Sequence, residues 1–183
     1  VPVWNKSFRE HGIVGSRPES VRAAADRAVS ELGWKRPYHV DADHINLDTV
    51  EGFIAASDFF TLDVASAIGQ AVPAADIEAF LARHPELVGR IEVEGLSDPI
   101  ASTPASVAST AAKYLFATAQ AGRIYRLVHS RKAGAPFITE VSMDETDNPQ
   151  TPPELLVILA AIADESIPAQ TIAPKFTGRF NKG

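Results

Sequence analysis

The sequence alternates strand-like and helix-like segments, and this alternation constrains the fold more than any other feature. Apolar patterns typical of strands occur at residues 38–44, 59–65, 137–143 and 169–174. Between them lie segments with apolar residues at helical spacing, and no Asn-Gly hairpin dipeptide occurs. Parallel strands need long crossover connections, which are usually helices. The pattern therefore predicts an α/β fold in which βαβ units build a parallel sheet.

Helix boundaries are predicted from capping signals. The pairs Ser16–Glu19 and Thr151–Glu154 match the capping-box pattern, so a helix is expected to begin at each. A long helix is predicted over residues 104–132, and Gly122 is expected to divide it. Residues 155–164 are apolar almost all round, which predicts a buried helix.

Polar residues gather after the predicted strands rather than before them, and in a (β/α) barrel that face carries the active site. A complete eight-stranded barrel takes about 250 residues. Residues 1–183 are therefore expected to be a single segment of a larger barrel-type catalytic domain, a partial TIM-like barrel. Neither the dinucleotide pattern GxGxxG nor a phosphate-loop pattern occurs, so nothing supports a nucleotide site.

Composition excludes several classes of protein. Seventeen Lys and Arg against twenty-three Asp and Glu give a net charge of -6, which argues against nucleic acid or an anionic membrane as the main partner. The absence of cysteine excludes disulfides and thiolate metal sites. No apolar run approaches the roughly 20 residues that cross a bilayer, and no export signal is visible. A cytoplasmic location is the expectation.

The two ends of the chain predict a fragment. The sequence opens at Val1, its one methionine is Met143, and it closes on the polar stretch 180–183. A partial barrel would leave open strand edges, which favour association or aggregation. The isolated polypeptide is therefore expected to oligomerise or aggregate, to be poorly stable and to be inactive.

The densest group of chemically active side chains is Asp41-Ala42-Asp43-His44. If residues 39–43 form a strand, Asp41 and Asp43 share one face and His44 follows at its end. A histidine with carboxylates can bind a divalent cation, or one carboxylate can act as a base. The competing interpretation is structural, because Asp43 could instead cap the turn at residues 45–48.

Further charged residues stand where a substrate could meet them. Glu140 interrupts an apolar strand, where a carboxylate is costly to bury, so it either faces the barrel mouth or forms an internal ion pair. Lys175, Arg179 and Lys182 follow the last strand, and such cations suit a substrate that bears a carboxylate or phosphate. A plain surface-charge role is the alternative.

A smaller candidate anion site lies near the N-terminus. His11 and Arg17 flank a glycine-containing turn. The backbone N–H groups of Gly15 and Ser16 could face an anion there.

Several segments, taken together, resemble the tagaturonate/fructuronate epimerase family of hexuronate metabolism. They occur in the family's order and span the chain from end to end, and several are eight residues or longer. The resembling segments are residues 12–22, 40–45, 58–65, 138–145 and 174–183.

The resemblance implies a barrel-type fold, a divalent metal cofactor and a keto-uronate, a sugar acid, as substrate. By position, Asp43 matches the family's proton acceptor, His44 a metal-binding histidine, and Glu140 the proton donor. The family's other metal-binding histidines lie beyond the segment at which this sequence stops. This polypeptide alone is therefore expected to bind metal poorly.

The implied reaction interconverts D-tagaturonate and D-fructuronate, which differ at a hydroxyl-bearing carbon β to the ketone. Retro-aldol cleavage and re-addition would invert that carbon, with Asp43 as base, Glu140 as acid, and Lys175 or Arg179 holding the substrate carboxylate. Transient oxidation is the alternative mechanism. Two other functions stay open: another metal-dependent sugar isomerase or aldolase, and a non-catalytic carbohydrate-binding or assembly module.

Overall fold

The computed structural model describes residues 1–178, so Arg179 and Lys182 lie outside the described residues. The chain folds into two compact units. Unit 1 comprises Val1–Asp63, Arg123–Ser142 and Pro168–Ile172, and unit 2 comprises Val64–Gly122, Met143–Ile167 and, among the described residues, 173–178. The candidate residues Asp43, His44 and Glu140 all belong to unit 1.

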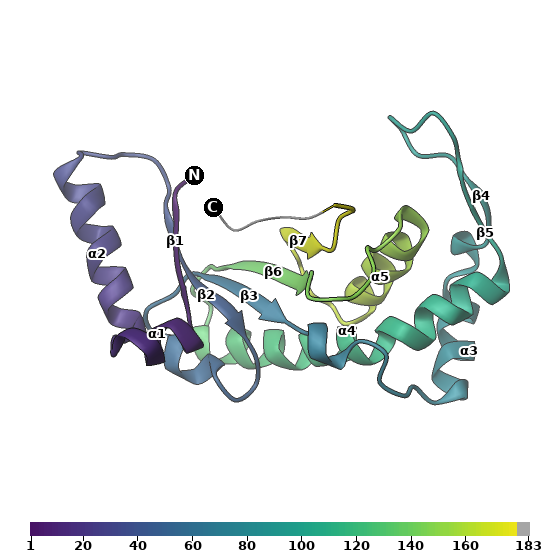
Figure 1. The fold of residues 1–183 in the computed structure, drawn as a ribbon, viewed down its shortest axis with the longest axis horizontal. Helices are drawn as coiled ribbons and strands as arrows, with labels where there is room; N and C mark the ends of the chain where they lie inside the picture. The colour runs from purple at the N-terminus through teal and green to yellow at the C-terminus, as the bar shows by residue number, and fades with distance from the viewer. Residues whose placement is uncertain (179–183) are drawn as a thin grey trace. The chain divides into compact units, whose positions relative to one another are not determined.

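A five-stranded sheet is the central element of the fold (Figure 1). Its strand order is β1-β2-β3-β6-β7, and the pairs β1–β2, β2–β3 and β3–β6 are parallel. The predicted parallel α/β fold is confirmed. A closed barrel is not found within residues 1–178, where β1 and β7 form the two edges of the sheet, so the TIM-like barrel is not confirmed. The strands are β1 (Val3–Ser7), β2 (His39–Ile45), β3 (Phe59–Asp63), β6 (Ile138–Met143) and β7 (Thr171–Pro174).

Helices connect these strands, and a small antiparallel ribbon interrupts the pattern. The helices are α1 (Phe8–Val14), α2 (Pro18–Glu31), α3 (Ala74–Arg83), α4 (Pro104–Lys132) and α5 (Pro152–Asp164). The ribbon pairs β4 (Gly89–Ile91) with β5 (Ile100–Ser102), and short 3-10 turns lie at Val50–Phe53, Ala65–Ala67 and Pro85–Leu87.

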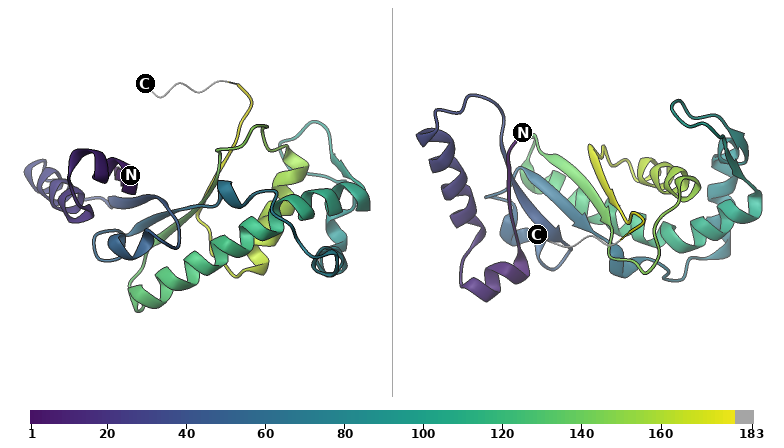
Figure 2. Two further views of the ribbon diagram at one scale, coloured as in Figure 1. Left: turned by 60° about the horizontal axis from the view of Figure 1, so that its bottom comes forward. Right: turned by 45° about the horizontal axis from the view of Figure 1, so that its top comes forward.

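Two local expectations are wrong. Gly122 does not divide α4, which runs unbroken over 29 residues (Figure 2), because one glycine costs only about 1 kcal/mol in a helix with good formers on both sides. Ser16 does not cap α2: the N-cap is Arg17, and the Ser16 hydroxyl lies 2.8 Å from His11 Nδ1. The capping box near the N-terminus is instead Ser7 with Glu10, at the start of α1.

Alternation along the strands gives the sheet two unlike faces. One face carries the apolar side chains of Val40, Ala42, Phe60, Leu62 and Val141, all of which are buried. Asp41, Asp43, Thr61 and Glu140 alternate with these residues and belong to the opposite face. Residues 123–132 of α4 belong to unit 1, and Lys132 Nζ lies 5.9 Å from the Phe60 ring centre. The end of α4 therefore packs beside the apolar face.

Arg22 of α2 fixes the start of β2. Its guanidinium forms an ion pair with Asp58 at 2.9 Å and donates a hydrogen bond to the Ala56 carbonyl at 2.8 Å. Asp58 Oδ1 in turn accepts a hydrogen bond from the backbone N–H of Val40 at 2.8 Å. This chain of contacts holds β2, and with it the candidate carboxylates, against the segment that leads into β3.

Unit 2 has a separate apolar core formed by α3, the 3-10 turn Pro85–Leu87, α5 and the first part of α4. Its buried members are Phe80, Leu87, Val107, Ala111, Val157 and Ala161. The expectation that α5 is buried all round is only partly met, because Leu159 is 46% exposed. The helix buries one apolar side and leaves another uncovered among the described residues.

The capping box at α5 predicts a measurable contribution to stability. The Thr151 hydroxyl accepts from the backbone N–H of Glu154, while the Glu154 carboxylate accepts from the Thr151 backbone N–H at 2.8 Å. Thr151→Ala is expected to lower the free energy of unfolding by about 1 kcal/mol in urea titrations. Thr110→Ala is the control, since that hydroxyl bonds the Ser106 carbonyl inside α4 and caps nothing. Equal losses for both variants would contradict the capping role.

Candidate active site

A β-bulge places Asp43 and His44 at the end of β2. The register runs from Ala42 opposite Phe60 to Ile45 opposite Leu62, so two residues of β2 face the single residue between those partners on β3. His44 has a φ of 52°, a left-handed conformation that is uncommon outside glycine. Its Nδ1 lies 2.7 Å from Asp43 Oδ1. The bulge therefore turns an imidazole and a carboxylate toward one another.

Asp41, Thr61 and Glu140 form a row across three neighbouring strands. The Thr61 hydroxyl lies 2.9 Å from Asp41 Oδ2 and 3.4 Å from Glu140 Oε1. The Thr61 backbone N–H donates to Asp41 Oδ1 at 3.2 Å. Asp41 is only 7% exposed, so the two hydrogen bonds from this threonine replace contacts that water would otherwise make with its carboxyl group.

The electrostatics of this row favour a protonated carboxyl group. Burial raises the pKa of Asp41 to about 7, hydrogen bonds from Thr61 offset part of this rise, and the charges of Asp43 and Glu140 add to it. These two like charges on the same face disfavour the ionised form of Asp41. The face can therefore hold a proton near neutral pH, which general acid–base chemistry requires.

The structure brings some predicted residues together. Asp43 and Glu140 lie on the same face of the sheet, on the two strands that flank β3. In the turn that follows β2, Asn46 Oδ1 accepts from the backbone N–H groups of Asp48 and Thr49, and the alternative role of Asp43 as a turn cap stays a prediction. Sequence reasoning missed Thr61, although a hydroxyl in the middle of an apolar strand was a signal that could have been noticed.

The predicted cation cluster is only partly described. Lys175 belongs to unit 2, a different unit from that of Asp43 and Glu140. Its backbone exchanges hydrogen bonds with Gln150, whose side-chain oxygen accepts from the Lys175 N–H. The predictions for Arg179 and Lys182 fall outside the described residues.

The candidate anion site near the N-terminus is wrong. The backbone N–H groups of Gly15 and Ser16 both donate to the His11 carbonyl, so they close the end of α1 and do not point to a ligand. Arg17 is exposed at the N-cap of α2. The backbone N–H groups of this turn therefore do not support the predicted role of Arg17 in substrate binding.

A metal site is not complete within the described chain. No group of three or more His, Asp or Glu side chains that could hold a metal ion occurs in residues 1–178. His44 offers one imidazole, and its contact with Asp43 matches the carboxylate–histidine pairing that orients metal-bound histidines. Fitting a divalent cation here would need ligands from outside residues 1–178.

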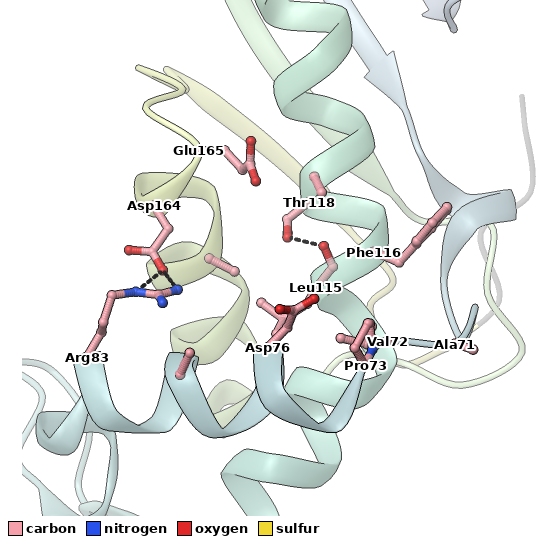
Figure 3. Close-up of a pocket in the computed structure, with 13 residues that line it drawn as sticks. Ala71, Val72, Pro73, Asp76, Arg83, Leu115, Phe116, Thr118, Asp164 and Glu165 are labelled. Atoms are coloured by element: carbon pink, nitrogen blue, oxygen red, sulfur yellow. Dashed lines mark hydrogen bonds and ion pairs between the residues drawn. The ribbon is translucent and has the colours of Figure 1, made fainter.

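Unit 2 contains a separate pocket of about 280 Å³ between α3, α4 and α5 (Figure 3). The Arg83 guanidinium donates two hydrogen bonds to Asp164 Oδ2, at 3.2 and 2.7 Å. Asp76 and Glu165 add two more carboxylates to the lining, and none of the residues predicted from the sequence lines it. Three carboxylates beside one guanidinium make the pocket a poor site for an anionic substrate.

Comparison with known proteins shows the family of this chain. The family model of UxaE, tagaturonate epimerase, matches residues 1–183. The chain belongs to the tagaturonate epimerase family. A search of curated proteins found no match, and none of the helices in residues 1–178 is long and apolar enough to span a membrane.

Crystal structures from the same family share the fold. The native fructuronate-tagaturonate epimerase UxaE from Cohnella laeviribosi has a TM-score of 0.79 at 22% identity over 97% of this chain. Its complex with one glycerol has a TM-score of 0.80 at 21% identity over 98%. The chain spans 39% of the length of each of these proteins. At this identity the likeness establishes the fold.

The buried carboxyl of Asp41 predicts a pH dependence of stability. Its folded pKa of about 7 exceeds the ordinary aspartate value of 3.8, so the folded state holds a proton that the unfolded chain loses between these values. Stability should therefore fall as pH rises from 4 to 7, by an upper limit on the order of 4 kcal/mol. Asp41→Asn should flatten this decline in urea titrations at pH 4.5 and 7.5. Identical pH slopes for both proteins would contradict the assignment.

Proposed function

We propose that this chain supplies part of the active site of an isomerase that interconverts D-tagaturonate and D-fructuronate. The family match over residues 1–183 supports this substrate pair. The observation that carries the proposal is the placement of Asp43 and Glu140 on one face, on the strands that flank β3. Two carboxyl groups on one face can serve as base and acid for the same substrate. A cytoplasmic location belongs to the same proposal.

The chemistry of the substrate pair favours carbon–carbon cleavage over simple proton abstraction. The two sugar acids differ at a hydroxyl-bearing carbon β to the ketone, whose C–H is not acidified by enolisation. A β-hydroxy ketone can instead undergo retro-aldol cleavage. The hydroxyl proton leaves, the C–C bond breaks, and its electron pair passes to the ketone fragment as an enolate while the hydroxyl carbon becomes an aldehyde. Rotation of the aldehyde and re-addition then give the epimer.

Asp43 and Glu140 divide the proton transfers in this scheme. Asp43 takes the proton from the substrate hydroxyl in the cleavage step, and Glu140, two strands away in the sheet, gives a proton to the new alkoxide on re-addition. Asp43 then releases its proton to solvent and Glu140 regains one from solvent, so the proton count balances over the cycle.

A divalent cation is part of the proposal, with His44 as one ligand. When bound, such a cation would supply charge stabilisation for a developing oxyanion. His44 is held by Asp43, which fixes the orientation of the ring. Further ligands are proposed to come from outside the described residues. Lys175, with Arg179 and Lys182, is proposed to bind the carboxylate of the sugar acid.

The proposed activity is tested with the longest natural polypeptide that carries residues 1–183. The protein is supplied with keto-uronates and with neutral ketoses, in the presence of Mn²⁺, Ni²⁺ or Zn²⁺. Interconversion of tagaturonate and fructuronate supports the proposal. Turnover of ketoses alone would favour a different sugar isomerase or aldolase, and ligand binding without turnover would favour a carbohydrate-binding module. Incorporation of a labelled aldehyde fragment into product tests cleavage, and its strict absence would count against the retro-aldol step.

The two carboxylates should be required for turnover. Asp43→Asn and Glu140→Gln are each expected to lower kcat by roughly 10²- to 10⁴-fold, because each removes one proton-transfer group. Glu78→Gln is the matched control, since Glu78 is exposed on α3 of unit 2 and should leave kcat unchanged. Wild-type values of kcat in both Asp43→Asn and Glu140→Gln would contradict the assignment of Asp43 as base and Glu140 as acid.

If His44 is a metal ligand, its replacement should weaken cation binding, which can be measured separately from turnover. Dialysis against a chelator should abolish turnover of the same polypeptide, and added divalent cation should restore it. His44→Ala should weaken cation binding, measured by calorimetry, by about 10-fold or more. His84→Ala is the control, because His84 lies in unit 2 beside Glu86 and Asp164. Unchanged cation affinity in His44→Ala would exclude His44 as a ligand.

A further inference from the structure

Thr61 contacts two carboxyl groups on neighbouring strands, and neither the predicted chemistry nor the family match assigns it a role. Its hydroxyl lies between Asp41 Oδ2 at 2.9 Å and Glu140 Oε1 at 3.4 Å. Thr61 is 3% exposed, so water has little access to this hydroxyl. We name the three side chains of Asp41, Thr61 and Glu140 the hydroxyl bridge.

The number of protons in the hydroxyl bridge decides what it can do. A threonine hydroxyl has one hydrogen, so two ionised carboxylates would compete for it. With Asp41 ionised, the Thr61 hydroxyl donates to Asp41 Oδ2. When Asp41 holds a proton this bond reverses: the Asp41 O–H donates to the Thr61 oxygen, and the hydroxyl hydrogen is then available to Glu140. Burial raises the pKa of Asp41 to about 7, which is consistent with this arrangement near neutral pH.

The backbone fixes one end of the hydroxyl bridge. The Thr61 N–H donates to Asp41 Oδ1 at 3.2 Å, so the other oxygen of that carboxyl group is the one that meets the hydroxyl. Thr61 and Glu140 are direct register partners on the parallel strands β3 and β6. The sheet therefore fixes the backbone positions of the threonine and the glutamate, and the Thr61 hydroxyl is placed to contact the glutamate side chain.

We propose that Thr61 is a positioning residue whose hydroxyl, held by Asp41, orients the Glu140 carboxyl group for proton transfer to the sugar acid. This inference rests on the proposed function, in which Glu140 is the acid. A glutamate side chain has three rotatable bonds, and a small misplacement of a catalytic group costs about 10²-fold in rate. Thr61 should therefore affect kcat much more than substrate binding.

The test measures kcat and KM for tagaturonate in the longest natural polypeptide that carries this segment. Thr61→Val removes the hydroxyl at nearly constant volume and should lower kcat by about 10- to 100-fold with KM within about 2-fold. Thr61→Ser restores a hydroxyl and should recover most of the lost kcat. A value of kcat within about 2-fold of the parent for Thr61→Val overturns the inference.

Thr139→Val provides the matched control. Thr139 is also a buried threonine, 1% exposed, on the strand next to β3, but its hydroxyl has no hydrogen-bond partner within the described chain. Its replacement should leave kcat unchanged. A loss of kcat equal to that of Thr61→Val would show a general sensitivity of the sheet to threonine replacement and would also overturn the inference.

A second pair of variants covers the case in which Thr61→Val fails to fold, as judged by circular dichroism. The Asn side chain in Asp41→Asn can donate to the Thr61 hydroxyl as protonated Asp41 does, whereas Asp41→Ala cannot. Asp41→Asn should therefore keep a higher kcat than Asp41→Ala by about 10-fold. Equal kcat values in the two variants overturn the inference.

The outcomes separate this inference from the proposed function. Loss of turnover in Glu140→Gln together with normal kcat in Thr61→Val leaves the proposed function intact and removes only the positioning role. Absence of tagaturonate turnover in the parent protein overturns the proposed function, and with it the inference.

Discussion

The two-residue period of the strands is the constraint on which the rest of this structure depends. In β2, β3 and β6 it places large apolar side chains on one face and carboxyl and hydroxyl groups on the other. The apolar face gains its stability by burial against the end of α4, where Lys132 lies over Phe60. Because a shift of register by one residue would exchange the faces, the packing that stabilises the sheet also fixes the position of the site.

The site combines two features that are unfavourable for stability. Asp41 is a buried carboxyl group, and His44 has a left-handed backbone conformation at a bulge. Each would cost free energy alone. Hydrogen bonds from Thr61 offset the cost of burying the Asp41 carboxyl group. The contact between His44 Nδ1 and Asp43 accompanies the left-handed backbone of His44. Such features persist where the surrounding structure holds them firmly, and they cluster at functional sites.

Much of the fold and part of the site could be predicted from the sequence, because those features are local. The positions of β2, β3, β6 and β7, the parallel sheet and the capping box at Thr151 follow from periodicity and from side chains three residues apart, whereas the edge strand β1 was not predicted. Wrong expectations arose where a local pattern had a stronger competitor. Ser16 resembled a cap, but its hydroxyl contacts His11 across the turn, and Gly122 was too weak a breaker to end α4.

The sequence by itself determined which chemical groups are present and the family to which the chain belongs: Asp41, Asp43, His44 and Glu140 could be identified from residue type and spacing. Only the tertiary structure decided that Thr61 joins Asp41 to Glu140 and that a bulge turns His44 toward Asp43. These contacts depend on the register between strands that are up to 79 residues apart in sequence. Register follows from packing of the whole sheet, so no local pattern encodes it.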